Sequence, residues 1–219
     1  MKTIQLTLIT FLTTLSALSF VRAQDSDPSP GKLPVYANIS IGYGNTFFSG
    51  TLGEKETIND SRGFGRNQGN TLTTWFYAAP AHWKGLGVGT GVKGFFATPN
   101  NGGNNETYLF NYYHVGVGAK YYLLSRTFNK GLCLKSSFGI GQMTEKTKFN
   151  ATRVYQHQFA VGTTLLAGLG YSIPVFKRRS ALNIDFDYET ASRRGDVTGI
   201  GENQPFRNSH VSLNIGLGF

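Results

Sequence analysis

The sequence has one cysteine, two methionines, few charged residues and, beyond its N-terminal segment, no long apolar run. The single thiol, Cys133, excludes an intramolecular disulfide and a cysteine-rich metal cluster. Only 15% of the 219 residues are charged and 40% are apolar, which argues against both a coiled coil and a disordered chain. The missing apolar run excludes transmembrane helices of roughly 18 residues or more. One domain is expected at this length.

The N-terminal segment has the features of an export signal. It begins with Lys2, continues through residues 4–21 without an acid or a base, and ends at Ala23, a small residue suited to cleavage. We expect residues 1–23 to be a signal peptide and the polar, proline-rich residues 24–33 to be a flexible periplasmic leader. The alternative is an uncleaved N-terminal helix. Cleavage would change the net charge from +9 to +9 − 2 = +7, so the exported chain is basic.

From residue 34 onward, apolar residues recur at every second position, which is the period of a β-strand with one apolar face. The clearest example is residues 182–189, where Leu182, Ile184 and Phe186 alternate with polar residues. The strands predicted from this pattern cover residues 35–43, 72–79, 86–96, 113–123, 132–141, 159–173, 182–189 and 210–219, eight in all. The faces of residues 72–79 stay unassigned, because three aromatic residues follow one another there.

The two faces of these strands differ in a way that suggests which one points outward. The apolar faces of the seven assignable strands carry no charged residue, and the opposite faces are crowded with glycine. Glycine weakens a strand that faces water, but on the concave side of a narrow barrel it lets the wall close. We therefore expect the apolar faces to meet lipid. The charged residues of the other faces would form an interior charge network of Lys93, Lys120, Lys135, Asp185, Asp187 and Glu189.

The connections alternate in length as they do in outer-membrane barrels. Those at 80–85, 125–131 and 174–180 are short, whereas those at 50–70, 98–106, 146–155 and 190–208 tend to be longer and more polar. The sequence thus predicts an all-β fold, an eight-stranded antiparallel up-and-down transmembrane β-barrel over residues 34–219. It would lie in the bacterial outer membrane with its N-terminus in the periplasm. A soluble β-sandwich or a lipocalin-like binding protein is the alternative.

The last ten residues, His-Val-Ser-Leu-Asn-Ile-Gly-Leu-Gly-Phe, carry a resemblance to a known class. They look like the C-terminal signal by which outer-membrane barrels are recognised by their assembly machinery. With the strand count, residues 34–219 resemble the small outer-membrane barrels of the OmpA/OmpX and opacity type. The resemblance implies that the barrel-assembly machinery is a partner. The residues that match the signal are Leu213, Ile215, Leu217 and Phe219.

One pair of residues could carry chemistry. His210 and Ser212 share a strand face, as a base and a hydroxyl nucleophile would. The pair is similar to one in the lipid A deacylase family, in which a Glu on the following strand orients the His. Here no strand follows, so Glu189 or Asp187 on a neighbouring strand would have to replace that residue. We expect satisfied interior residues rather than a catalytic site, and no metal site or cofactor.

The basic residues concentrate in the predicted turns and loops, as in Lys177-Arg178-Arg179. In a membrane setting, their partners would be outer-membrane lipids and lipopolysaccharide rather than nucleic acid. We expect a non-enzymatic barrel with a structural or surface-interaction role, in which the extracellular loops recognise an unidentified surface or envelope protein. A channel for small solutes or hydrophobic compounds is the main alternative, and a lipid A-modifying hydrolase using His210 and Ser212 comes third.

Overall fold

The computed structural model describes residues 33–49, 68–97, 100–102, 106–149, 155–175, 180–197 and 201–219. The signal peptide expected at 1–23 lies outside the described residues, as does the leader except for Leu33. In the described part of the chain, no helix has the length and the apolar character that crossing a membrane would require.

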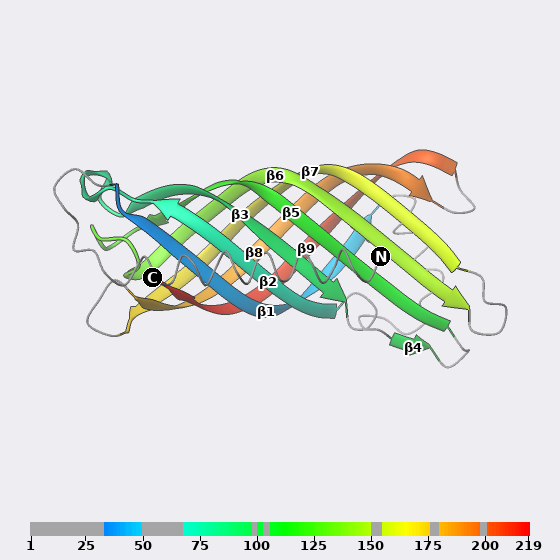
Figure 1. Cartoon of the computed structure of the whole chain (residues 1–219), viewed down its shortest axis with the longest axis horizontal. Coiled ribbons are helices and arrows are strands. Elements are labelled where there is room, and N and C mark those ends of the chain that lie inside the picture. Colours follow the sequence, from blue (N-terminus) through cyan, green and yellow to red (C-terminus); the bar gives the residue numbers. More distant parts are fainter. Residues whose placement is uncertain are drawn as a thin grey trace.

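The described residues form one closed β-barrel (Figure 1). Each long strand is antiparallel to its neighbours in the chain, β1 pairs with β9, and β3 pairs with β5. The strands are β1 (Val35–Ser49), β2 (Gln68–Ala78), β3 (Leu86–Ala97), β4 (Asn100–Gly102), β5 (Glu106–Tyr122), β6 (Gly131–Phe149), β7 (Tyr155–Pro174), β8 (Ala181–Val197) and β9 (Gly201–Gly218). The barrel wall consists of all of these except β4, which pairs only with β5. The predicted eight-stranded antiparallel barrel is confirmed.

The first and last strands form the seam that closes the wall. Their pairing runs from Asn38 opposite Gly218 to Ser49 opposite Arg207. Phe219 extends the seam, because its backbone N–H and C=O bond to Ala37 at 2.9 and 2.8 Å. Closure leaves no free sheet edge among these strands, which is the condition for a sheet to cross lipid.

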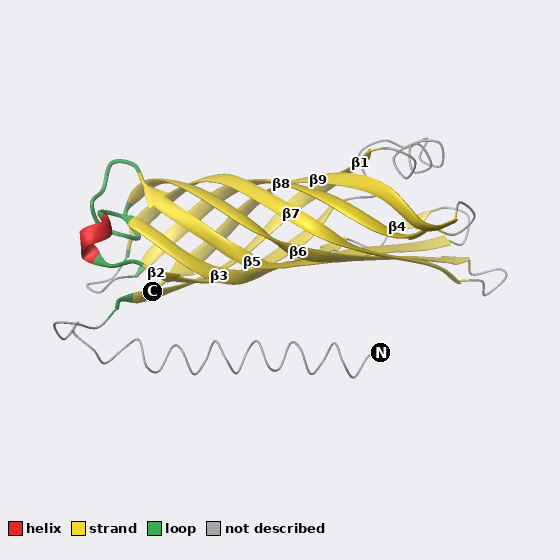
Figure 2. Cartoon of the chain, turned by 90° about the horizontal axis from the view of Figure 1, so that it is seen from above, coloured by secondary structure: helices red, strands yellow, loops and turns green. Residues whose placement is uncertain are grey.

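One end of the barrel carries the short connections and the other the longer ones. At the end with short connections, which we call the turn end, lie the 3-10 turn η1 (Ala81–Trp83) and residues 123–130 (Figure 2). At the opposite end, the loop end, β8 and β9 reach far beyond the predicted strand limits, so the loop predicted at 190–208 is wrong. The outward side chains there are polar, as at Ser192 and Arg194, but the backbone pairing continues regardless of side-chain polarity. The loop predicted at 146–155 is shortened in the same way.

The apolar rows face outward, as predicted. Large apolar side chains such as Ile41, Val117, Ile140 and Leu213 are more than half exposed on the outer surface. The structure also assigns β2, which the sequence left open: its buried positions are Thr71, Thr73, Trp75 and Tyr77. A soluble sandwich would bury the apolar rows against one another, so that alternative is excluded.

Inward glycines make room for the large residues of the lumen. A Cβ built on Gly91 would lie 2.4 Å from the indole of Trp75, and one on Gly87 would lie 2.4 Å from the ring of Phe128. Contacts this short cannot be relieved without moving a ring that is itself packed against others. At these two positions, glycine leaves the space that the aromatic side chains of a narrow barrel fill.

We expect the substitution Gly91→Val to destabilise the folded barrel by about 1–3 kcal/mol, because the added methyl groups would overpack the lumen beside Trp75. The matched control is Ala167→Val on the exposed outer face of β7, which should have little effect. The measurement is urea unfolding in detergent micelles, together with the mobility shift of unboiled samples on a gel. Equal stability of the two variants would contradict this account of the glycines.

Candidate functional site

The lumen of the barrel is the most chemically distinctive part of the molecule, and its centre is a row of carboxylates on β8. Asp185, Asp187 and Glu189 occupy successive inward positions, and all three are buried. Such positions are about 7 Å apart along a strand, so the three negative charges would repel one another unless cations lay between them. The structure supplies two lysines for this purpose.

Each of these lysines bridges two neighbouring carboxylates. Lys135 on β6 has its Nζ 3.1 Å from Asp185 and 2.6 Å from Asp187. Lys93 on β3 has its Nζ 3.5 Å from Asp187 and 3.4 Å from Glu189. We call the five residues Asp185, Lys135, Asp187, Lys93 and Glu189 the ion-pair ladder. Its charges alternate along the lumen, which compensates for the loss of hydration.

Lys93 spans the lumen. In the order of strands around the barrel, β3 and β8 are separated by four steps on either side, so they stand opposite each other in the wall. The ion pairs between Lys93 and the β8 carboxylates therefore cross the interior. The Lys93 and Glu189 side chains are both fully buried.

Polar side chains that the sequence analysis did not single out complete this network. The Tyr112 hydroxyl donates to Glu189 at 3.3 Å, and the ring of His114 lies 4.0 Å from the same carboxylate. Asn214 donates to Asp187 at 3.0 Å and accepts a hydrogen bond from Thr71. These residues share the inward parity of their strands, which was the signal available in the sequence.

Lys120, predicted as part of the network, is buried on the inward face of β5. Among the described residues it makes no ion pair, and its Nζ lies 5.4 Å from the centre of the Tyr122 ring instead. The structure thus brings five of the six predicted charges together and places Lys120 nearer the turn end.

Aromatic residues pack inside the lumen on both sides of the ion-pair ladder. The turn-end cluster contains Trp75, Tyr77, Tyr122 and Phe128, and Phe128 comes from the turn between β5 and β6. The loop-end cluster contains Phe95, Tyr112 and Met143 with two alanines, and Phe48 packs against it. The centres of the Phe95 and Tyr112 rings are 5.4 Å apart. Sequence periodicity could not reveal Phe128 as a lumen residue, because it lies outside any strand.

The three low-ranked catalytic candidates all lie in the lumen but do not form a catalytic array. His210 Nδ1 is 3.0 Å from the hydroxyl of Thr46. The Ser212 hydroxyl accepts hydrogen bonds from Lys93 and Asn214, both at 3.2 Å. Glu189 stands opposite His210 in the strand register, yet its carboxylate is engaged by Lys93 and Tyr112. The wall of the barrel separates all three from the lipid-facing surface.

Comparison with known proteins finds likeness in three dimensions but none in sequence. No protein-family model matches the chain, and no curated protein matches it. The crystal structure of Ail, the attachment invasion locus protein of Yersinia pestis, matches with a TM-score of 0.52 and 17% identity, covering 84% of this chain and 98% of Ail. The structure of Ail with the heparin analogue sucrose octasulfate gives a TM-score of 0.54 and 16% identity, covering 85% and 100%.

This chain has the fold of the small bacterial outer-membrane β-barrels. The neisserial surface protein NspA is also matched, with a TM-score of 0.45 and 11% identity over 84% of this chain and 95% of NspA. At 16–17% identity, the two matches to Ail establish the fold and nothing finer. Within the outer-membrane barrel fold, the predicted assembly-signal residues Leu213, Ile215 and Leu217 are exposed on the outer face of β9.

The ion-pair ladder makes Asp187 a sensitive position. We expect Asp187→Asn to lower the free energy of unfolding by about 3 kcal/mol, because Lys135 and Lys93 would then remain buried with one fewer carboxylate. Asp196→Asn, on the exposed outer face of the same strand, should change stability by less than about 0.5 kcal/mol. Equilibrium urea unfolding followed by tryptophan fluorescence measures both. If Asp187→Asn and Asp196→Asn lowered the free energy of unfolding equally, the ion-pair ladder would not stabilise the barrel more than an exposed carboxylate does.

Proposed function

We propose that the protein is a non-enzymatic outer-membrane barrel with a closed lumen, whose function lies at its outer surface. The loop end would face the exterior and the turn end the periplasm, with residues 1–23 removed on export and residues 24–33 left as a periplasmic leader. This orientation rests on the strand extensions and the longer connections at the loop end. Residues 34–219 would form the membrane domain.

The observation that carries the proposal is the crossing of the lumen by Lys93. A channel needs a continuous polar path, whereas here buried ion pairs join opposite walls between two aromatic clusters. An eight-stranded barrel is only wide enough to be filled by side chains, so little space is left beside them. This arrangement supports an anchoring role over conduction of solutes or of hydrophobic compounds.

The loop end supplies a rigid surface for recognition. The outward row of β8 is apolar from Leu182 to Tyr188 and then changes to Thr190, Ser192 and Arg194. A strand needs only about 9–11 residues to cross a bilayer, while β8 has 17 and β9 has 18. The polar parts of β8 and β9 beyond Tyr188 would project past the hydrocarbon as a pair of hydrogen-bonded strands, which we call the platform. The platform would hold the loops in place.

The partner we propose for this platform is a surface or envelope molecule outside the lipid phase. Ail, which shares the fold, was solved in complex with the heparin analogue sucrose octasulfate, so a barrel with this fold can bind a polyanion. The present chain shares only the fold with Ail. The chemistry of its partner therefore has to be inferred from the residues of this chain. Leu213, Ile215, Leu217 and Phe219 would engage the barrel-assembly machinery during insertion.

The closed lumen predicts an electrically silent protein. Reconstituted into planar bilayers, the wild-type chain should produce no stepwise conductance, and in liposome swelling it should admit no small sugar. A general porin reconstituted in parallel serves as the positive control. Discrete conductance steps that scale with the amount of this protein would contradict the closed lumen and favour the channel hypothesis.

The orientation predicts which end can be labelled from outside. A membrane-impermeant maleimide applied to intact cells should modify Glu202→Cys at the loop end, and should modify Arg126→Cys at the turn end only after lysis. The native Cys133 is fully buried and should contribute little background. Labelling of Arg126→Cys alone in intact cells would mean that the barrel is inserted the other way.

A further inference from the structure

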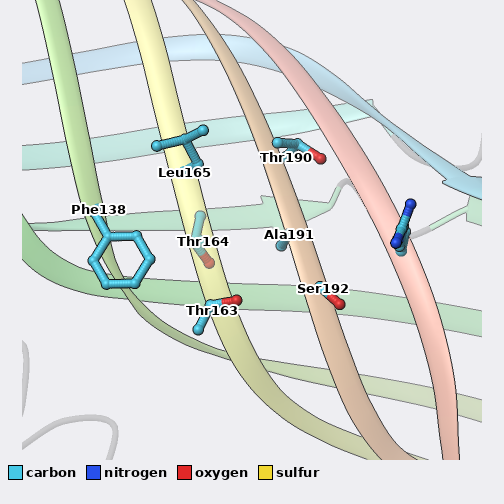
Figure 3. A pocket seen from close by; sticks show the side chains of 8 residues that line it. Phe138, Thr163, Thr164, Leu165, Thr190, Ala191 and Ser192 are labelled. Carbon is cyan, nitrogen blue, oxygen red and sulfur yellow. The ribbon is translucent and has the colours of Figure 1, made fainter.

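A depression of about 250 Å³ lies on the outer surface of the wall, across β6, β7, β8 and β9. Figure 3 shows its lining side chains, with Phe138 on β6, Thr163 and Leu165 on β7, and Thr190 and Ser192 on β8. Arg207 on β9, together with the inward residues Thr164 and Ala191, completes the lining. The depression lies on the outer face of the wall, and no part of the proposed anchoring role uses it.

The strand register explains why the surface is hollow here. One row across the strands joins Ile140, Thr163, Ser192 and Arg207, and the adjacent row joins Phe138, Leu165, Thr190 and Ser209. In both rows large apolar residues stand at one side and small hydroxyl residues follow them. In the first row, the long side chain of Arg207 on β9 ends the row next to Ser192. Small side chains between large ones leave a groove between neighbouring strands.

The groove is amphipathic along its length. Its apolar side belongs to the outer surface of the barrel, where Phe138 is 56% exposed and Leu165 is 54% exposed. Its polar side lies where the outward row of β8 has already changed from apolar to polar, just past Tyr188. Tyrosine favours the boundary between lipid and water, so the groove crosses that boundary.

The polar side of the groove carries positive charge that no carboxylate of the described residues neutralises. Among the residues described by the structure, neither Arg207 nor the exposed Arg194 has a carboxylate within ion-pair distance. Arg194 stands opposite Pro205, two residues from Arg207 on the paired strand, which places the two Cβ atoms about 7 Å apart. Two guanidinium groups at this spacing can hold one phosphate between them, with hydroxyl donors of Ser192 and Thr190 beside it.

We propose that this groove binds a phosphorylated, acylated sugar lipid of the outer leaflet, the lipid A part of lipopolysaccharide. An acyl chain would lie along Phe138 and Leu165, and a sugar phosphate would reach Arg207, Arg194 and the hydroxyls. Lipid A fits because it joins phosphate directly to a densely acylated headgroup at the depth where the groove changes character. The assignment rests on the proposed orientation, since only the loop end would meet that leaflet.

The test measures lipid A bound to the purified full-length barrel in phosphatidylcholine nanodiscs by native mass spectrometry. Arg207→Gln should weaken binding about tenfold, the effect of losing one charge-assisted hydrogen-bonding group. Ser192→Leu, which fills the groove without altering charge, should weaken it to a similar degree. Arg126→Gln at the turn end removes the same charge elsewhere and should leave binding unchanged. All variants are first checked for folding by their gel mobility without boiling.

Dephosphorylated lipid A provides the second arm. It should bind the wild type about tenfold more weakly, and Arg207→Gln should then cause no further loss. Inorganic phosphate and sucrose octasulfate, added as competitors, should displace lipid A poorly. Complete displacement by either, or equal binding by wild type, Arg207→Gln and Ser192→Leu, would overturn the proposal. The conductance and labelling experiments do not depend on this groove, so its failure is distinguishable from failure of the anchoring role or of the orientation.

Discussion

A chain that crosses lipid must pair every backbone N–H and C=O within itself, because hydrocarbon offers no hydrogen-bond partner. In this protein the pairing of β1 with β9 and of β3 with β5 meets that requirement by closing the sheet. Closure fixes which face of each strand points into the lumen. The apolar rows are then free to contact lipid, and all charged residues of the spanning segments must be accommodated inside a narrow tube.

The side chains of the lumen both fill the narrow barrel and neutralise its buried charges. Inward glycines give up volume to Trp75 and Phe128, and the carboxylates of β8 are separated by Lys135 and Lys93. Because Lys93 reaches the opposite wall, the ion pairs that neutralise the charge also cross the lumen. Under the proposed function, the partners of the protein would meet the outside of the barrel. There, the polar loop end and the groove ending at Arg207 are the surfaces that remain available for partners and lipids.

Strand periodicity predicted most of this fold, since alternation along seven strands is legible in the sequence and register follows from it. It failed at residues 190–208, because the loss of apolar alternation at Thr190 and Ser192 marks the edge of the hydrocarbon and not the end of the strand. It also left β2 unassigned, where Trp75 and Phe76 are both aromatic and only their neighbours in space decide that Trp75 points inward. Lys120 was grouped with the other interior charges, but it lies nearer the turn end of the barrel than the ion-pair ladder does, beside Tyr122.

By itself, the sequence determined the eight wall strands, the apolar outer surface and most of the interior charges, because each of these depends on parity along a strand. It missed Arg193, which is buried in the part of β8 that was predicted as a loop. Only the tertiary structure decided which interior charges meet, since this depends on the shear and the order of strands around the barrel. For the same reason, it was the closed barrel that paired Ser212 with Lys93 rather than His210, and that set Arg207 beside the hydroxyls of β8. Contacts across the lumen join residues that lie far apart in the sequence, as Lys93 joins Asp187 and Ser212, and no local pattern encodes them.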